Sequence, residues 1–276
     1  MWLTRCVCLP IACLVLAANA AGQAGSLPDR DTFLNDARAA LARSQQEWHR
    51  YSYKERRTEV HLNPFGRMGT GDTLVFEVRP SSNPRLTYRR LIERNGEPLS
   101  KAELDRQDAD YRERAAQVER SRRDADDRQR REQDDLLARQ RAQMIVEDVL
   151  NTLQFTLVRR EPRDGRPAIV VSFAARPGAR PTTRQGRIAK VFKGEVWVDE
   201  ASREVTYLNA VATDDVAFGG FVAKMYEGTE AVVDRQAIEP GVWMPVRLSL
   251  KGSVRALFRR AQVHYLVEWF DYRRTS

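Results

Sequence analysis

Histidine, the side chain used most often in acid–base catalysis and metal binding, is scarce in this chain. His49, His61 and His264 each stand alone among unlike neighbours. No His-x-x-x-His pair and no carboxylate-rich loop supplies a set of metal ligands. Alternation along a strand places His264 opposite Val263 and Tyr265, so we expect it to be exposed to solvent. The sequence therefore predicts no metal site.

Other catalytic motifs are missing as well. Residues 69–72, Gly-Thr-Gly-Asp, lack the lysine spacing and the strand–turn–helix context of a P-loop, and no Gly-x-Ser-x-Gly elbow is present. The acid pairs Asp134-Asp135 and Asp214-Asp215 lie in a charged helix and in a turn. A hydrolase would need His, Ser and acidic residues that are distant in sequence to meet in the fold. We therefore predict no catalytic activity and no cofactor.

One segment has the composition of a functional loop. Residues 216–228 place Phe218 and Phe221 on either side of Gly219 and Gly220, just after a polar turn. Because glycine adopts backbone angles that other residues avoid, the segment could form a flap over an apolar interior. A hairpin turn with ordinary core phenylalanines explains the same pattern. The sequence leaves both interpretations open.

The first 20 residues have the plan of a secretory signal peptide. One positive charge, Arg5, precedes an apolar stretch from Cys6 to Ala18, and Ala18 and Ala20 are the small residues of a cleavage site. We expect cleavage after Ala20, with an uncleaved anchor as the alternative. All three cysteines lie in this stretch, so the rest of the chain can form no disulfide and no thiolate site. Export without cysteine favours a bacterial periplasm.

The chain is basic, with a net charge of +8, and arginine supplies most of the positive charge. An arginine excess is typical of nucleic-acid binding, but an exported protein rarely meets nucleic acid, and we predict none as a partner. The excess is also compatible with an anionic membrane surface. A bias in base composition of the gene would produce it without any function.

The elements before residue 100 are one helix and several strands. After Asp29, the apolar residues Phe33, Leu34, Ala37 and Leu41 recur at helical spacing and predict a helix that ends near Trp48. Strand patterns follow over residues 51–62, 72–79 and 85–95, the last of which closes with the hairpin-type turn Asn95-Gly96.

The section from Leu99 to Glu161 contains no glycine and no proline. Ser100 and Glu103 have the spacing of a helix-starting capping box. Residues 101–143 balance twelve basic against twelve acidic residues, and many acids precede an arginine by four positions, as at 108/112 and 110/114. One apolar residue per heptad is too few for a coiled coil. We predict a solvated helical projection or a helical hairpin.

Strands dominate again from Phe155 to the end, linked by short polar turns such as 199–204. Residues 242–250 alternate most regularly, with Val242, Met244, Val246, Leu248 and Leu250 on one face; Pro245 indicates an edge strand or a strand end. One apolar and one polar face indicate an antiparallel sheet that either curves around helices or closes into a barrel. The predicted fold class is α+β: an antiparallel half-barrel of about ten strands with an N-terminal helix and a long charged helical insertion.

The chain then divides into four parts. These are the signal peptide (1–20), the N-terminal helix with the first strands (21–99), the charged helical insertion (100–153) and the remaining strands (154–276).

This order of elements resembles the outer-membrane lipoprotein-sorting proteins, the periplasmic carriers of the LolA/LolB-like class. The segments that carry the resemblance are the leader, the first helix, YSYKERRTEV, LIERNGEPLS, GEVWVDEASREVTYLNA, the FGGF segment and GVWMPVRLSLKGSV leading to YLVEWFDYRR. The resemblance implies an incomplete antiparallel barrel, closed by helices over a cavity for acyl chains. The charged insertion departs from the family pattern.

Alternation alone assigns Phe76, Phe173, Val198, Met244 and Leu248 to the apolar face of the half-barrel, where they are candidates for lining a ligand cavity. Each could equally be an ordinary core residue. The resulting hypothesis is a periplasmic carrier whose partner is the acyl chain of a lipid or lipoprotein. The alternative is a periplasmic protein-interaction or envelope-stress sensor module, with the charged helix as the docking arm for an envelope protein.

Overall fold

The computed structural model describes residues 26–62, 68–81, 86–122, 125–218, 223–256 and 259–275. The predicted signal peptide lies outside these residues, and so do Gly219, Gly220 and Phe221 of the predicted flap; Phe218 ends a short strand. Among the described helices, none is both long and apolar enough to cross a membrane.

Helices interrupt a long series of strands. The helices are α1 (Arg30–Glu47), the 3-10 turn η1 (Trp48–Arg50), α2 (Lys101–Arg122), α3 (Ala125–Thr152) and α4 (Arg184–Ala189). The first strands are β1 (Tyr51–Leu62), β2 (Met68–Arg79), β3 (Tyr88–Arg94), β4 (Glu97–Pro98), β5 (Leu153–Arg160) and β6 (Ala168–Ala175). The others are β7 (Phe192–Asp199), β8 (Val205–Ala212), β9 (Val216–Phe218), β10 (Ala223–Met225), β11 (Glu230–Glu239), β12 (Val242–Ala256) and β13 (Arg259–Arg274).

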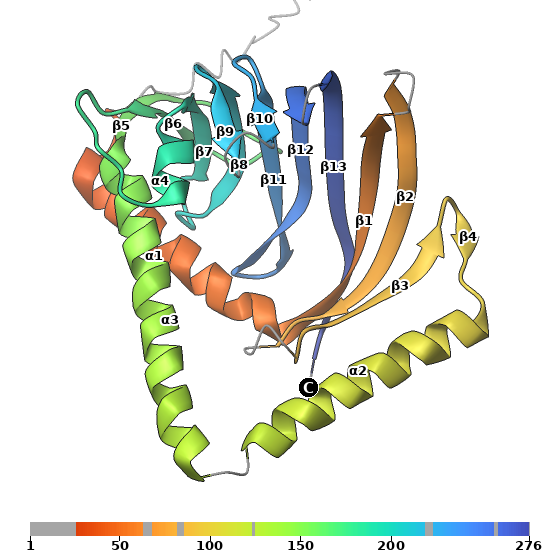
Figure 1. Ribbon diagram of the computed structural model, residues 1–276. Helices are drawn as coiled ribbons and strands as arrows, with labels where there is room; N and C mark the ends of the chain where they lie inside the picture. Colours follow the sequence, from red (N-terminus) through yellow and green to blue (C-terminus); the bar gives the residue numbers. More distant parts are fainter. Residues whose placement is uncertain are drawn as a thin grey trace, which may run out of the picture.

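All described strands belong to one antiparallel sheet, which is strongly curved and open (Figure 1). Eleven strands follow in the order β4-β3-β2-β1-β13-β12-β11-β8-β7-β6-β5. The short strands β9 and β10 pair with each other, and β10 also pairs with β12. The pairing of β1 with β13 joins the two ends of the chain in the middle of the sheet. The predicted α+β half-barrel is confirmed, with more strands than the ten expected.

Helix α1 lies inside the curve of the sheet and supplies its main core (Figure 1). Asp29 caps the helix by accepting a hydrogen bond from the Thr32 backbone N–H. Phe33 and Ala37 then pack against Ile169 and Val171 of β6. The apolar stripe expected from the sequence therefore faces the sheet.

The charged section forms two helices, α2 and α3, which meet at an angle below the sheet (Figure 1). The predicted capping box starts α2: the Glu103 backbone N–H donates to Ser100 Oγ, and the Ser100 N–H donates to Glu103 Oε2. The predicted Asn95-Gly96 hairpin turn is also present, with positive φ angles of 53° and 86°.

The expected regular alternation over residues 242–250 is wrong at one position. Asp234 of β11 pairs with Arg247, but the next residue, Arg235, pairs with Pro245. Val246 is therefore the extra residue of a β-bulge, and the residues on its two sides do not share one alternation. Pro245 lies at this bulge in an interior strand, not at the sheet edge, because a bulge tolerates a residue that cannot donate a ladder hydrogen bond.

Candidate functional site

The cross-strand register identifies which side chains share the concave face. Directly paired residues of antiparallel strands point to the same face. From β6 to β13 one row of pairs is entirely apolar, and the same face at β6 packs on α1. The row consists of Val171, Val196, Leu208, Val233, Leu248 and Val267. The concave face therefore carries a continuous apolar band across six strands.

Helix α1 covers this band only in part. Val171 is buried under α1, whereas Val233 and Leu248 are half-buried. A second apolar pair on the same face, Leu250 of β12 and Tyr265 of β13, is also half-buried. Figure 1 shows β12, β13, β1 and β2 extending beyond α1. Within the band, Val171 and Val267 at the two ends are buried, whereas the middle residues Val196, Leu208, Val233 and Leu248 are half-buried.

The five residues predicted for a ligand cavity lie in different surroundings. Phe173 and Val198 pack in the described hydrophobic clusters beside α1 and β5, and Met244 is fully buried with 1% exposure. Leu248 lies on the half-buried part of the apolar band. Phe76 of β2 lies beside a charged cluster. Leu248 and Phe76 are therefore the two that a ligand on the concave face would reach first.

A buried carboxylate, Glu55 of β1, lies at the β1 end of the concave face. Only 5% of Glu55 is exposed, and it accepts hydrogen bonds from the guanidinium groups of Arg57 and Arg89. The Trp269 indole N–H also donates to it, at 3.2 Å. The Arg89 guanidinium lies 4.2 Å from the centre of the Phe76 ring, a cation–π geometry. Two cations around one anion leave this end of the apolar band positively charged.

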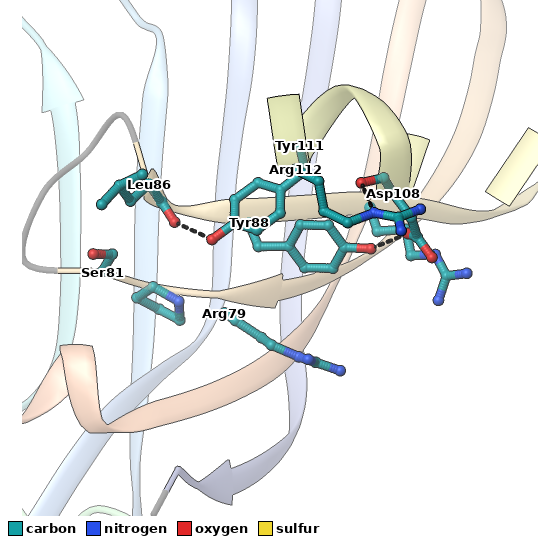
Figure 2. A pocket seen from close by; sticks show the side chains of 9 residues that line it. Arg79, Ser81, Leu86, Tyr88, Asp108, Tyr111 and Arg112 are labelled. Atoms are coloured by element: carbon teal, nitrogen blue, oxygen red, sulfur yellow. Dashed lines mark hydrogen bonds and ion pairs between the residues drawn. The ribbon is translucent and has the colours of Figure 1, made fainter. Parts of the chain in front are cut away.

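A separate pocket of about 690 Å³ lies where α2 meets β2 and β3 (Figure 2). Its polar walls are Arg79, Arg90, Asp108 and Arg112, and its rings are Tyr88 and Tyr111. The two rings make an edge-to-face contact with 4.6 Å between centroids. Arg79 pairs with Tyr88 across strands β2 and β3, one residue pair beyond Val78 and Arg89. Alternation therefore puts the pocket on the convex side of the sheet, away from Glu55.

Hydrogen bonds from α2 hold the pocket together. The Tyr88 hydroxyl donates to Asp108, and the Tyr111 hydroxyl donates to the Leu86 carbonyl at 3.1 Å (Figure 2). Burial, together with the bond to Asp108, raises the pKa of Tyr88 to about 12. Tyr88 is therefore neutral at physiological pH and adds no negative charge to the pocket.

The sequence reasoning missed this pocket. Asp108 and Arg112 were expected to form an ion pair along the helix, but the Asp108 carboxylate binds Tyr88 and lies 3.2 Å from Arg90. Arg112 donates instead to the Asp108 backbone carbonyl. The one available signal was Tyr111, a lone aromatic residue in an otherwise charged helix.

No described group of three or more His, Asp or Glu side chains could hold a metal ion. His264 is exposed, as predicted, and its Nε2 lies 3.0 Å from Ser249 Oγ.

No protein-family model matches the chain, and no curated protein matches it. Among solved structures, the chain is similar to a DUF1329 family protein from Desulfovibrio piger, with 10% identity, a TM-score of 0.32, and coverage of 88% of this chain and 92% of that one. It is also similar to a Vibrio parahaemolyticus domain assigned to outer membrane lipoprotein sorting, with 9% identity, a TM-score of 0.35, and coverage of 89% and 93%. A MucA/MucB complex from Pseudomonas aeruginosa gives 9% identity, a TM-score of 0.22, and coverage of 87% and 99%.

The class of protein that the sequence resembles is thus named among the solved structures to which the chain is similar. Superpositions as loose as these say nothing about a ligand or a partner.

Proposed function

We propose that this protein is a periplasmic carrier that holds an acyl chain of a lipid or lipoprotein against the concave face of its sheet, without catalysis. The observation that carries the proposal is the apolar band on that face, whose middle residues Val196, Leu208, Val233 and Leu248 are only half-buried. An acyl chain in contact with Val233, Leu248 and Leu250 would remove this apolar surface from water. The periplasmic location rests on the leader sequence.

The charged end of the band supports an amphiphilic ligand. Arg57 is paired with Val267 of the band in the β1–β13 register, and together with Arg89 it outnumbers Glu55. A polar head group that leaves the apolar band at β1 would meet these guanidinium groups. The excess of arginine in the chain also suits contact with an anionic membrane surface.

The test compares two adjacent residues of β12 that point to opposite faces. Leu248→Lys places a charge on the concave band, whereas Ser249→Lys places the same charge on the convex face. The protein, processed and purified gently from a bacterial periplasm, should carry acyl ligands in native mass spectrometry. Leu248→Lys should weaken binding of a fluorescent fatty acid about tenfold or more, and Ser249→Lys should bind like the wild type.

Circular dichroism establishes that both variants are folded. If Leu248→Lys does not fold, Leu250→Trp fills the same face without a charge and should weaken fatty-acid binding as well. Equal fatty-acid binding by Leu250→Trp, by Ser249→Lys and by the wild type would refute the carrier.

A further inference from the structure

We propose that the pocket between α2 and strands β2 and β3 binds a phosphate ester. The guanidinium groups of Arg79, Arg90 and Arg112 hold the phosphate, and the rings of Tyr88 and Tyr111 pack against the carbon part of the ligand. This site is separate from the acyl site proposed above, because it lies on the convex side of the sheet.

The shape of the pocket fits a small organic molecule. Its volume of about 690 Å³ lies within the range of roughly 300–1,000 Å³ that is usual for small-molecule sites. Figure 2 shows the rings of Tyr88 and Tyr111 side by side, with Arg112 and Asp108 near the Tyr88 hydroxyl and Arg79 on the other side of the Tyr88 ring. Leu86 and Pro80 add apolar surface. One wall is therefore apolar and aromatic while the rest is charged.

The charges of the pocket favour an anion. Three arginines and one acid, Asp108, line it. Glu77, from β2, lies 3.3 Å from Arg79 and 3.9 Å from Arg90. With Glu77 included, three positive charges face two negative charges, and Tyr88 stays neutral. A phosphate suits three guanidinium groups better than a carboxylate does, because its oxygens can accept from several donors at once.

Arg90 Nε has an ion-pair partner in the pocket wall but no well-aligned hydrogen bond. Arg90 Nε is buried and makes no hydrogen bond, although Asp108 Oδ1 is 3.2 Å away, because the geometry of that contact is poor. A buried N–H group without an acceptor is unfavourable. Because this Nε has almost no surface open to a ligand, a phosphate would bind the outer nitrogens of Arg90, whose side chain is 23% exposed.

The test is calorimetric titration of the full-length processed protein with three probes: phenyl phosphate, inorganic phosphate and dihexanoyl phosphatidic acid below its micellar concentration. Phenyl phosphate should bind, and more tightly than inorganic phosphate, because only the ester reaches the tyrosine rings. Arg112→Gln should weaken binding about tenfold. Arg106→Gln, on the same helix but outside the pocket, should leave it unchanged.

The same experiment distinguishes a lipid head group from a soluble phosphate ester as the ligand. Phosphatidic acid that competes with phenyl phosphate identifies a lipid head group as the ligand, and phenyl phosphate binding without such competition identifies a soluble ester. Absence of phenyl phosphate binding, or equal losses in Arg112→Gln and Arg106→Gln, overturns the proposal. Leu248→Lys should bind phenyl phosphate normally, so failure of the acyl carrier and failure of this site are distinguishable.

Discussion

A buried ion pair on the sheet, between Glu204 and Arg235, is hydrogen-bonded to α1. Glu204, the residue before β8, accepts a hydrogen bond from the Ser44 hydroxyl of α1 at 2.6 Å. It accepts another from the Arg235 guanidinium of β11 at 3.1 Å. The side chains of Glu204 and Arg235 are only 6% and 9% exposed. Burial lowers the pKa of Arg235, while Glu204 opposes the shift. Each of these charges is held in the core by the other.

Arg235→Met should therefore destabilise the protein strongly. The substitution leaves the Glu204 carboxylate buried without its counter-charge, and breaking such a pair costs about 3–5 kcal/mol. Urea unfolding followed by tryptophan fluorescence measures the loss. In the double variant Glu204→Gln, Arg235→Met the unpaired charge is gone, so its loss should be smaller than that of Arg235→Met alone. A double variant that is less stable than the single one would contradict this account.

At the scale of elements, one aspartate joins α3 to the start of α4. Asp148 accepts hydrogen bonds from the backbone N–H and hydroxyl groups of both Thr182 and Thr183, at 2.6 to 3.2 Å. Gly186 lies so close that a Cβ atom there would be 2.0 Å from Asp148 Oδ2. The hydrogen bonds, first from the Thr183 hydroxyl and then from the backbone, lower the pKa of Asp148 to about 2.

This pKa predicts a pH dependence for Asp148→Asn. Because the pKa in the folded protein is below the usual 3.8, ionised Asp148 stabilises the fold above about pH 4, and the stabilisation is lost as the pH falls through about 2. At pH 7, Asp148→Asn should lower the midpoint of thermal unfolding by a few degrees. The difference from the wild type should shrink below about pH 4. A difference that persists unchanged to pH 2 would show that the charge of Asp148 is unimportant.

Helix α2 protects the open edge of β3. The Gln107 side chain accepts from the Leu91 backbone N–H at 2.8 Å and donates to the Leu91 carbonyl at 3.0 Å. It thus takes the place of a neighbouring strand at the point where the short strand β4 no longer reaches. Unpaired edges invite association between chains, so this contact has a role in keeping the sheet from extending.

Gln107→Leu should expose that edge. Two half-buried backbone groups would lose their partners, at a cost of about 1–3 kcal/mol each when water cannot replace them. Size-exclusion chromatography with light scattering should show more dimer or aggregate than in the wild type at equal concentration. Gln107→Glu keeps the acceptor for the Leu91 N–H and should give an intermediate result. A monomeric and fully stable Gln107→Leu would mean that the helix backbone alone shields β3.

At the scale of the whole molecule, parts of the charged helices α2 and α3 contact the rest of the fold, and other parts are exposed. The first three turns of α2 contact β3 through Gln107, Asp108 and Tyr111, and the end of α3 holds α4 through Asp148. Farther from the sheet, α3 exposes apolar side chains such as Leu137 (40%) and Met144 (55%). These two are seven residues apart and so share a face of the helix. This is the part that the alternative hypothesis of a docking arm would use.

Two linker replacements distinguish the parts of α2 and α3 that support the sheet from the parts that are exposed. Replacing residues 116–140 with a flexible glycine–serine linker should leave the midpoint of thermal unfolding within a few degrees of the wild type, because none of the described buried residues lies in this stretch. Replacing residues 101–143 removes the cover of β3 and should cause association or unfolding. Fatty-acid binding should survive the shorter deletion. If the shorter deletion unfolds the sheet, the distal helices are part of the core and not an arm.

Much of the local structure follows from the sequence. The capping box Ser100–Glu103, the Asn95-Gly96 turn and the apolar stripe of α1 were all predicted and are all present. Each depends on residues within a few positions of one another, so the chain specifies it without reference to the rest of the fold. The antiparallel sheet follows in the same way from repeated alternation between short turns, whereas its open shape was expected from the family resemblance.

Which strands pair, and in what register, depends on contacts between residues that are far apart in the sequence. The bulge at Val246 ends the alternation that the sequence suggested, and a bulge moves every later side chain to the other face. The pairing of β1 with β13 brings Trp269 to Glu55, and the packing of α2 on β3 brings Tyr111 to Tyr88.

The sequence by itself therefore determined most of the elements of this protein and their order, though not helix α4, and the absence of metal and nucleophile motifs, because these depend on neighbouring residues. Only the tertiary structure decided which arginines meet which acids and rings. Arg57, Arg89 and Arg112 look alike in the sequence. Strand register and helix packing place the first two at a buried carboxylate on the concave face and the third in an aromatic pocket on the convex face.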